Sequence, residues 1–182
     1  MHVLIQEARR LLEAYTGKGV MVAVYPPIQI ARQLAIPTGL EPDDLHMTLA
    51  FLGDSDKIGR KAMRKAEQVC ARISKTTEPI KAAISGVGRF SASRTSGGQD
   101  VYYASIDAPA LPELRHRLVR ALQKAGVSVA QDHGFTPHMT LSYLGQNEVA
   151  PLQHFDPMKT TFRALTLSVG SDKKHFSLAA IG

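Results

Sequence analysis

The sequence has few of the features that mark disulfide-rich, membrane or secreted proteins. Its single cysteine, Cys70, cannot form an internal disulfide. Its position in an expected helix favours a small core residue in a reducing compartment over a catalytic thiol. No stretch approaches about 18 consecutive apolar residues, so we expect no membrane span. Residues 1–10 lack the basic start, apolar run and small-residue cleavage site of a secretory signal, and we expect a cytoplasmic protein.

Zinc-binding clusters and nucleotide-binding glycine loops are also missing. His133 and His138 are close in sequence, but third and fourth ligands at the spacing of a zinc site are absent. Two histidines alone still leave a metal pair as an alternative, yet we expect no metal and no other cofactor. Gly86 and Gly88 lack the third glycine and the strand-to-helix setting of a dinucleotide-binding loop. A β-bulge or a close backbone approach is the better interpretation of these glycines.

The length and composition are those of one globular domain. The chain has 182 residues, of which 44% are hydrophobic and 21% charged, which is enough for a substantial core. Its formal net charge of +6 favours anionic partners, including nucleotides and RNA. Much of this charge falls on two expected helices, over residues 57–75 and 115–124. A solvated helix face and a binding stripe are both open interpretations of that pattern.

Two octapeptides of the chain are nearly identical. Residues 46–53 read HMTLAFLG and residues 138–145 read HMTLSYLG, so six of eight positions match. The two differences exchange a small residue for a small one and an aromatic for an aromatic. Chance is a poor explanation for such a match, and we infer an internal duplication.

Each copy carries a histidine followed two residues later by a threonine. Because side chains alternate along a strand, His46 and Thr48 are expected to share one face. The second copy is expected to place His138 and Thr140 together in the same way. The opposite, core-facing side of the two strands is expected to carry Met47, Leu49, Phe51, Met139, Leu141 and Tyr143.

The hydrophobic periodicity predicts strand–helix–strand order twice along the chain. We expect an α+β fold over residues 19–182, with two similar lobes in one domain and an amphipathic helical extension over residues 1–18. Two mainly antiparallel sheets with outer helices are each expected to hold one His-x-Thr strand facing a central cleft. The expected helices are 3–16, 28–34, 56–74 and 111–125, and the expected strands are 19–25, 45–52, 79–90, 101–106, 138–144, 161–169 and 175–181.

Two imidazoles and two hydroxyls in one cleft would suit phosphodiester chemistry. Histidine has an ordinary pKa of about 6.5, so one copy can accept a proton while the other donates one. Thr48 and Thr140 would hold phosphate oxygens. A cyclic phosphodiester is a sensible target, because it needs only in-line attack and protonation of the leaving group. A lone strand histidine is more often structural, but core packing requires neither group in both copies.

These residues resemble the 2H phosphoesterase superfamily, and in particular its LigT-like branch of 2′-5′ RNA ligases and RNA 2′,3′-cyclic phosphodiesterases. The resemblance covers about residues 19–181. Its main basis is the pair of motifs His46-Met47-Thr48 and His138-Met139-Thr140. Supporting features are the strand end Tyr25-Pro26-Pro27, the Leu-Gly pair after each motif, the segments 86–90 and 101–104, and Pro137 before the second histidine.

The resemblance implies a metal-independent enzyme that hydrolyses 2′,3′-cyclic phosphates to 2′-phosphates, or cleaves 2′-5′-linked or cyclic oligonucleotides. It implies that His46 is the proton donor and that His138 activates water. It also implies that Thr48 and Thr140 bind phosphate oxygens. A 2′-5′ RNA ligase and a non-catalytic RNA- or nucleotide-binding module remain the alternatives.

Other side chains are candidates for contacting the substrate around the motif pair. Tyr25, Tyr102 and Phe135 are candidates for stacking on a base, and Arg94 for gripping a flanking phosphate. Ordinary core or surface roles are the alternative for each of them. The expected partner is RNA with a cyclic phosphate end, or a small cyclic or 2′-5′-linked nucleotide, bound by a monomer that does not contact membranes.

Overall fold

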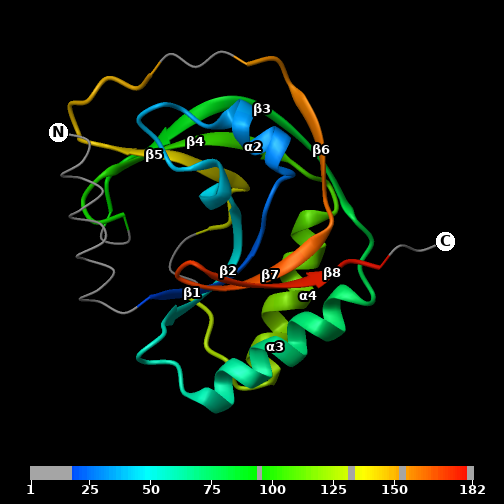
Figure 1. Cartoon of the computed structure of the whole chain (residues 1–182). Helices are drawn as coiled ribbons and strands as arrows, with labels where there is room; N and C mark the ends of the chain where they lie inside the picture. Colours follow the sequence, from blue (N-terminus) through cyan, green and yellow to red (C-terminus); the bar gives the residue numbers. More distant parts are fainter. Residues whose placement is uncertain (1–17, 94–95, 131–133, 152–154, 180–182) are drawn as a thin grey trace.

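The computed structural model describes residues 18–93, 96–130, 134–151 and 155–179 (Figure 1). The extension expected over residues 1–18 lies outside these ranges, apart from Lys18. The described elements, in chain order, are β1 (Gly19–Val24), α2 (Ile28–Leu34), the 3-10 turn η1 (Pro42–Asp44), β2 (Met47–Asp54), α3 (Arg60–Ser74), β3 (Ile80–Phe90), β4 (Asp100–Asp107), α4 (Leu111–Lys124), β5 (His138–Leu144), β6 (Met158–Phe162), β7 (Ala164–Val169) and β8 (Asp172–Ser177).

The strands form two four-stranded sheets, in which all neighbouring strands run antiparallel. The first sheet has the order β2-β1-β7-β8 and the second has the order β5-β4-β3-β6. The repeat strands β2 and β5 are edge strands of their sheets and contact each other. The two sheets therefore meet along the repeated segments, which confirms the expected α+β architecture of two antiparallel sheets (Figure 1).

The stretch 161–169, expected as one strand, is divided between the two sheets. Its first part belongs to β6, which pairs with β3, and its second part belongs to β7, which pairs with β1. Arg163 alone separates the two strands. A continuous apolar run does not reveal such a crossing, because Phe162 and Leu165 are equally buried in their different sheets.

The two long helices both cover the first sheet. Helix α3 contacts β7 and β8, while α4 contacts β2 and packs against α3. Their buried residues fall on the predicted stripes, which in α4 consist of Leu111, Leu114, Leu118 and Leu122. The two long helices are thus not shared equally between the two sheets. None of the described helices combines the length and apolarity needed to cross a bilayer.

Cys70 lies on the buried side of α3 and is fully buried. Burial raises the pKa of its thiol to about 12, because the thiolate would lose its hydration. The prediction of a small core residue is confirmed.

Each motif strand carries a β-bulge at the residue after its threonine. In β2, Thr48 pairs with Ala23 and Ala50 pairs with Val22, so Leu49 is the extra residue. In β5, Thr140 pairs with Tyr103 and Ser142 pairs with Tyr102, so Leu141 is the extra residue. The duplication therefore extends to the backbone irregularity itself.

The bulged edges are covered reciprocally by the two halves of the chain. The carbonyl of Leu49 accepts a hydrogen bond from Arg115 Nε at 3.1 Å, and the carbonyl of Phe51 accepts one from the amide of Ala130 at 2.9 Å. The carbonyl of Leu141 in turn accepts a hydrogen bond from the amide of Leu40 at 2.8 Å. Backbone acceptors left over by the bulges are thus satisfied.

The bulges reverse the alternation of side chains beyond each threonine. Ala50 and Ser142 are buried, whereas Phe51 is 40% exposed and Tyr143 is half-buried. The expectation that Phe51 and Tyr143 share the core face with Leu49 and Leu141 is wrong for this reason. The bulge interpreted from Gly86 is confirmed, because the pairing of β3 with β4 shifts between Ile84 and Val87.

Candidate active site

The two motif histidines are held by the same local hydrogen bond. His46 Nδ1 lies 2.6 Å from the carbonyl oxygen of Asp44, and His138 Nδ1 lies 2.7 Å from that of Thr136. A carbonyl can only accept, so Nδ1 carries the proton in both neutral rings. Nε2 is then the nitrogen that can accept a proton or, in the charged ring, donate one. The two half-buried imidazoles therefore have matched tautomers.

Aromatic and cationic side chains lie close to His46, which immediately precedes β2. The ring of Tyr25 lies 5.4 Å from the His46 ring and 6.5 Å from the His175 ring, between centroids. Lys173 Nζ lies 4.6 Å from the centroid of Tyr25 and 3.8 Å from a carboxylate oxygen of Asp44. Strand β8 thus brings a lysine and a further histidine to the motif of the first sheet.

Burial raises the pKa of the Tyr25 hydroxyl above its ordinary value. This hydroxyl donates a long hydrogen bond of 3.5 Å to Ser168 Oγ. At neutral pH Tyr25 is therefore a neutral ring with a donor. Its place beside His46 is compatible with the predicted substrate contact.

Thr48 belongs to a row of paired residues across the first sheet. It pairs with Ala23, Ala23 pairs with Thr166, and Thr166 pairs with His175. Paired residues on neighbouring strands project to the same face, so these side chains share one side. Thr166 Oγ1 lies 2.8 Å from His175 Nδ1.

Among the described residues, the Thr48 hydroxyl has only a weak acceptor. It donates to Met21 Sδ at 3.4 Å, and a thioether sulfur accepts hydrogen bonds poorly. Losing this hydrogen bond in order to donate to a phosphate oxygen would therefore cost little free energy.

In the second sheet, His138 lies against two aromatic rings. Its ring centroid is 5.0 Å from that of Phe90 and 5.5 Å from that of Tyr103, both edge-on. Phe90 and Tyr103 stack on each other at 4.1 Å. Tyr103 is paired with Thr140 on one side and with Gly88 on the other. A Cβ at Gly88 would clash with the ring carbon Cζ of Tyr103, so glycine is what allows the ring to lie there.

The structure supports the other sequence candidates unequally. Tyr102 is buried and its hydroxyl donates to the carbonyl of Pro151 at 2.9 Å, so it is a core residue and the predicted substrate contact is wrong. Its neighbour Tyr103 lies on the motif face beside His138, because successive residues of β4 face opposite sides. Phe135 is half-buried beneath Arg115, whose guanidinium carbon lies 4.5 Å from the ring centroid. Its substrate contact stays a prediction. Arg94 lies outside the described residues.

Four residues near the motifs were not predicted from the sequence. Alternation alone cannot choose between adjacent tyrosines, and the last strand begins at Asp172 rather than at 175. The four residues are Phe90, Tyr103, Lys173 and His175.

Among the residues that the structure describes, no group of three or more histidine, cysteine, aspartate or glutamate side chains could hold a metal ion.

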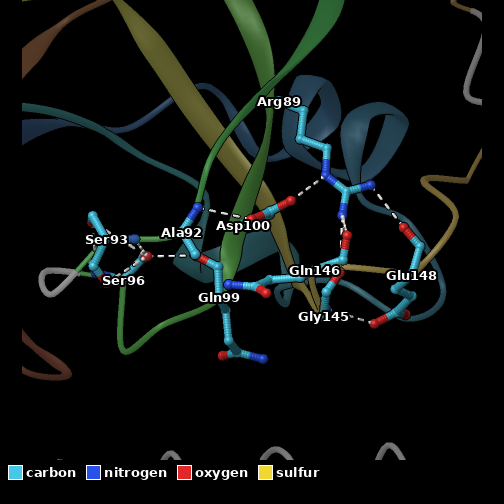
Figure 2. Close-up of polar contacts among 9 residues, drawn as sticks. All are labelled: Arg89, Ala92, Ser93, Ser96, Gln99, Asp100, Gly145, Gln146 and Glu148. Atoms are coloured by element: carbon cyan, nitrogen blue, oxygen red, sulfur yellow. Dashed lines mark hydrogen bonds and ion pairs between the residues drawn. The ribbon is translucent and has the colours of Figure 1, made fainter.

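Arg89 fixes the far end of the second motif strand (Figure 2). Its guanidinium donates to Asp100 Oδ2 at 2.7 Å, to the carbonyl of Glu148 at 2.7 Å and to that of Gly145 at 2.9 Å. The other carboxylate oxygen of Asp100 accepts the amide of Ala92 at 2.8 Å. One side chain thus joins the end of β3, the start of β4 and the loop after β5.

We expect Arg89→Ala to lower the free energy of unfolding by about 1–2 kcal/mol, because several charge-assisted hydrogen bonds at a partly exposed site are lost together. Arg89→Lys should recover only part of this loss, since an ammonium cannot span three acceptors in a fixed plane. Urea denaturation gives the free energies, and amide exchange at Ala92 reports loosening of the Asp100 contact. The exposed Arg163→Ala is the control. Equal stability of the Arg89 and Arg163 variants would show that the clamp is not needed.

A family model described as the 2′-5′ RNA ligase superfamily matches residues 22–173. The chain is 27% identical, over 151 residues, to the RNA 2′,3′-cyclic phosphodiesterase of Geobacillus stearothermophilus. That alignment covers 82% of this chain and 42% of the relative, so the chain spans less than half of the length of that protein.

Solved structures share the fold at low sequence identity. TT0787 of Thermus thermophilus is 20% identical with a TM-score of 0.66, over 90% of this chain and all of that one. Escherichia coli LigT, solved with 3′-AMP, is 19% identical with a TM-score of 0.61, over 89% of this chain and 95% of that one. The family match includes both His-x-Thr motifs and nearly all of both sheets. The chain therefore belongs to the 2′-5′ RNA ligase superfamily of 2H phosphoesterases.

Proposed function

We propose that the protein is a metal-independent phosphodiesterase that opens 2′,3′-cyclic phosphates, on RNA ends or small nucleotides, to leave a 2′-phosphate. The observation that carries this proposal is the matched geometry of the two motifs. Each imidazole is tied through Nδ1 to the carbonyl two residues before it, and each is followed two residues later by a threonine. The strands that carry them contact each other. Two copies with the same fixed tautomer are suited to proton transfer on either side of one phosphate.

In the proposed reaction the cyclic phosphate lies between β2 and β5, and the hydroxyls of Thr48 and Thr140 donate to its non-bridging oxygens. His138 Nε2 takes a proton from a water whose oxygen attacks phosphorus. The bond between phosphorus and the 3′ oxygen breaks in line with that attack. Charged His46 gives its Nε2 proton to the departing 3′ oxygen. The products are a 2′-phosphate and a free 3′-hydroxyl, and exchange of one proton with solvent restores both rings.

The surroundings of the two motifs support a nucleotide substrate. The ring of Tyr25 beside His46, and the Phe90–Tyr103 stack beside His138, offer flat surfaces on which a base can stack. The name of the Geobacillus relative and the 3′-AMP complex of LigT agree with this class of substrate. The roles of donor and acceptor follow the family resemblance.

Incubation with 2′,3′-cyclic mononucleotides, with and without EDTA, tests the proposal. We expect a 2′-phosphate product, identified by phosphorus NMR, at the same rate in both conditions. A product that disappears with EDTA would overturn the two-imidazole mechanism. A 3′-phosphate would overturn the assigned leaving group. Absence of product, with nucleotide binding retained, would favour the non-catalytic binding module.

The name of the superfamily supports ligation as a second candidate function. If the 5′-hydroxyl of a second RNA attacks phosphorus in place of water, the same two proton transfers give a 2′-5′ link. Supplying an RNA with a cyclic phosphate end together with a second RNA bearing a free 5′-hydroxyl tests this. A ligated product formed faster than the hydrolysed one would make ligation the principal activity.

A further inference from the structure

Helix α3 presents exposed basic residues along one side, near its start and near its end. At about 100° per residue, its exposed cations fall within a sector of about 120° on the side away from the sheet. The buried residues Ala66, Val69 and Ile73 lie on the other side. The only acidic residue of the helix, Glu67, is bonded to Lys174 at 2.7 Å. The cations of the stripe, which continues one residue beyond the helix, are Arg60, Lys61, Arg64, Arg72 and Lys75.

Helix α4 extends this surface, because it packs antiparallel beside α3 (Figure 1). Lys65 Nζ donates to the carbonyl of Ala125 at 2.7 Å, which joins the start of α3 to the end of α4. Arg117 donates to Thr76 Oγ1 at 2.9 Å, which joins the middle of α4 to the segment just after α3. The exposed cations that α4 adds are Arg120 and Lys124. We call these seven exposed cations the helical basic face: Arg60, Lys61, Arg64, Arg72, Lys75, Arg120 and Lys124.

The seven cations of the helical basic face form no ion pair in the described part of the chain. Across the described ranges, none of the seven side chains has a carboxylate or other hydrogen-bond partner, whereas Lys57, Lys173 and Lys174 lie beside carboxylates. Helix α3 has 15 residues and is therefore about 22 Å long. A stripe of that length with no acidic partner suits an extended polyanion better than a single phosphate.

We propose that the helical basic face binds the phosphate backbone of RNA, as a second contact surface outside the His-x-Thr motifs. The helices cover the buried face of the first sheet, whereas Thr48 and His175 face the other side, so the two surfaces are separate. A helix that lies on a membrane needs a free apolar side, and here the apolar sides of α3 and α4 are buried. The choice of RNA as the polyanion rests on the proposed function. The charged surface itself is observed independently of that function.

The test compares two triple variants of the full chain with the same change in net charge. Arg60→Glu, Arg64→Glu and Arg72→Glu reverse charge on α3. Lys81→Glu, Lys159→Glu and Arg163→Glu do so at exposed positions on and beside β3 and β6 of the second sheet. Fluorescence anisotropy with an RNA of about 20 nucleotides ending in a 3′-hydroxyl, titrated at several salt concentrations, measures affinity without turnover. Hydrolysis of a 2′,3′-cyclic mononucleotide is measured in parallel.

We expect the α3 variant to bind RNA at least about tenfold more weakly than the wild-type protein. The slope of the logarithm of the binding constant against the logarithm of salt concentration should be flatter by about 2, because each of the lost phosphate contacts contributes about 0.7. The control should lose much less affinity, and mononucleotide hydrolysis should be unchanged in both. Equal losses in the two variants would overturn the proposal, because net charge alone would explain them. Binding of a polyglutamate peptide but not of RNA by the wild-type protein would overturn it too. Specific loss of RNA binding in a protein with no mononucleotide turnover would support this surface while refuting the proposed hydrolysis.

Discussion

Replacing His138 or His46 with alanine is expected to lower kcat for hydrolysis of a 2′,3′-cyclic mononucleotide by about 10²–10⁴. In the proposed reaction each imidazole transfers a different proton, and methyl groups cannot take over either step. Because neither ring is fully buried, the fold should survive both changes. The double variant should be little worse than the single ones, because the two groups act in one concerted step.

The dependence of kcat/KM on pH separates the two roles. Wild-type protein should show a bell-shaped profile, since one imidazole must be neutral and the other charged. Residual activity of the His138 variant should lose the acidic limb, and that of the His46 variant the alkaline limb. His116→Ala, at an exposed position on α4, is the matched control and should leave the rate unchanged. A folded variant of either motif histidine with nearly full activity would remove that residue from the mechanism.

Gly39→Ala is expected to lower the free energy of unfolding by about 1–3 kcal/mol, the usual range for an overpacked site. A Cβ at Gly39 would overlap the carbonyl oxygen of Leu141 and would lie 2.5 Å from Ile36 Cγ1. The first of these atoms is backbone, so it can move away only if the bulge of β5 moves with it. Because Thr140 and His138 are on the same strand, kcat/KM should fall as well.

Gly59→Ala is the control for this prediction. A Cβ at Gly59 would meet nothing within 4 Å, and its φ of −65° suits any residue. Its stability should therefore change by less than about 0.5 kcal/mol, because the small loss at the helix start is offset by a less flexible unfolded chain. Urea denaturation of both variants gives the comparison. Equal stabilities would show that the segment before η1 does not depend on close contact with β5.

Short-range patterns in the sequence were enough to predict much of the fold. The repeat located both motif strands, the apolar stripe of α4 located its buried side, and the setting of Cys70 in α3 indicated a core position. These features depend on periods of 2 or 3.6 residues, which the sequence displays directly. The tautomers of the two histidines, in contrast, depend on the backbone just before each motif.

The predictions that failed depend on pairing between distant segments. Leu49 gives no local sign that it is the extra residue of a bulge, yet that bulge decides where Phe51 points. Tyr102 and Tyr103 are equivalent by composition, and only their register against β5 separates core from motif face. Lys173 comes to the first motif through pairing of β8 with β7, which lies far along the chain from His46.

Because the bulged edges are covered reciprocally, each half of the chain caps an edge strand that belongs to the other half. Arg115 and Ala130 donate hydrogen bonds to the strand that carries the first motif, and Leu40 donates one to the strand that carries the second. Detaching either half would leave open strand edges with unsatisfied carbonyls on its counterpart. The first and second halves of the chain are therefore expected to unfold together, in one cooperative transition.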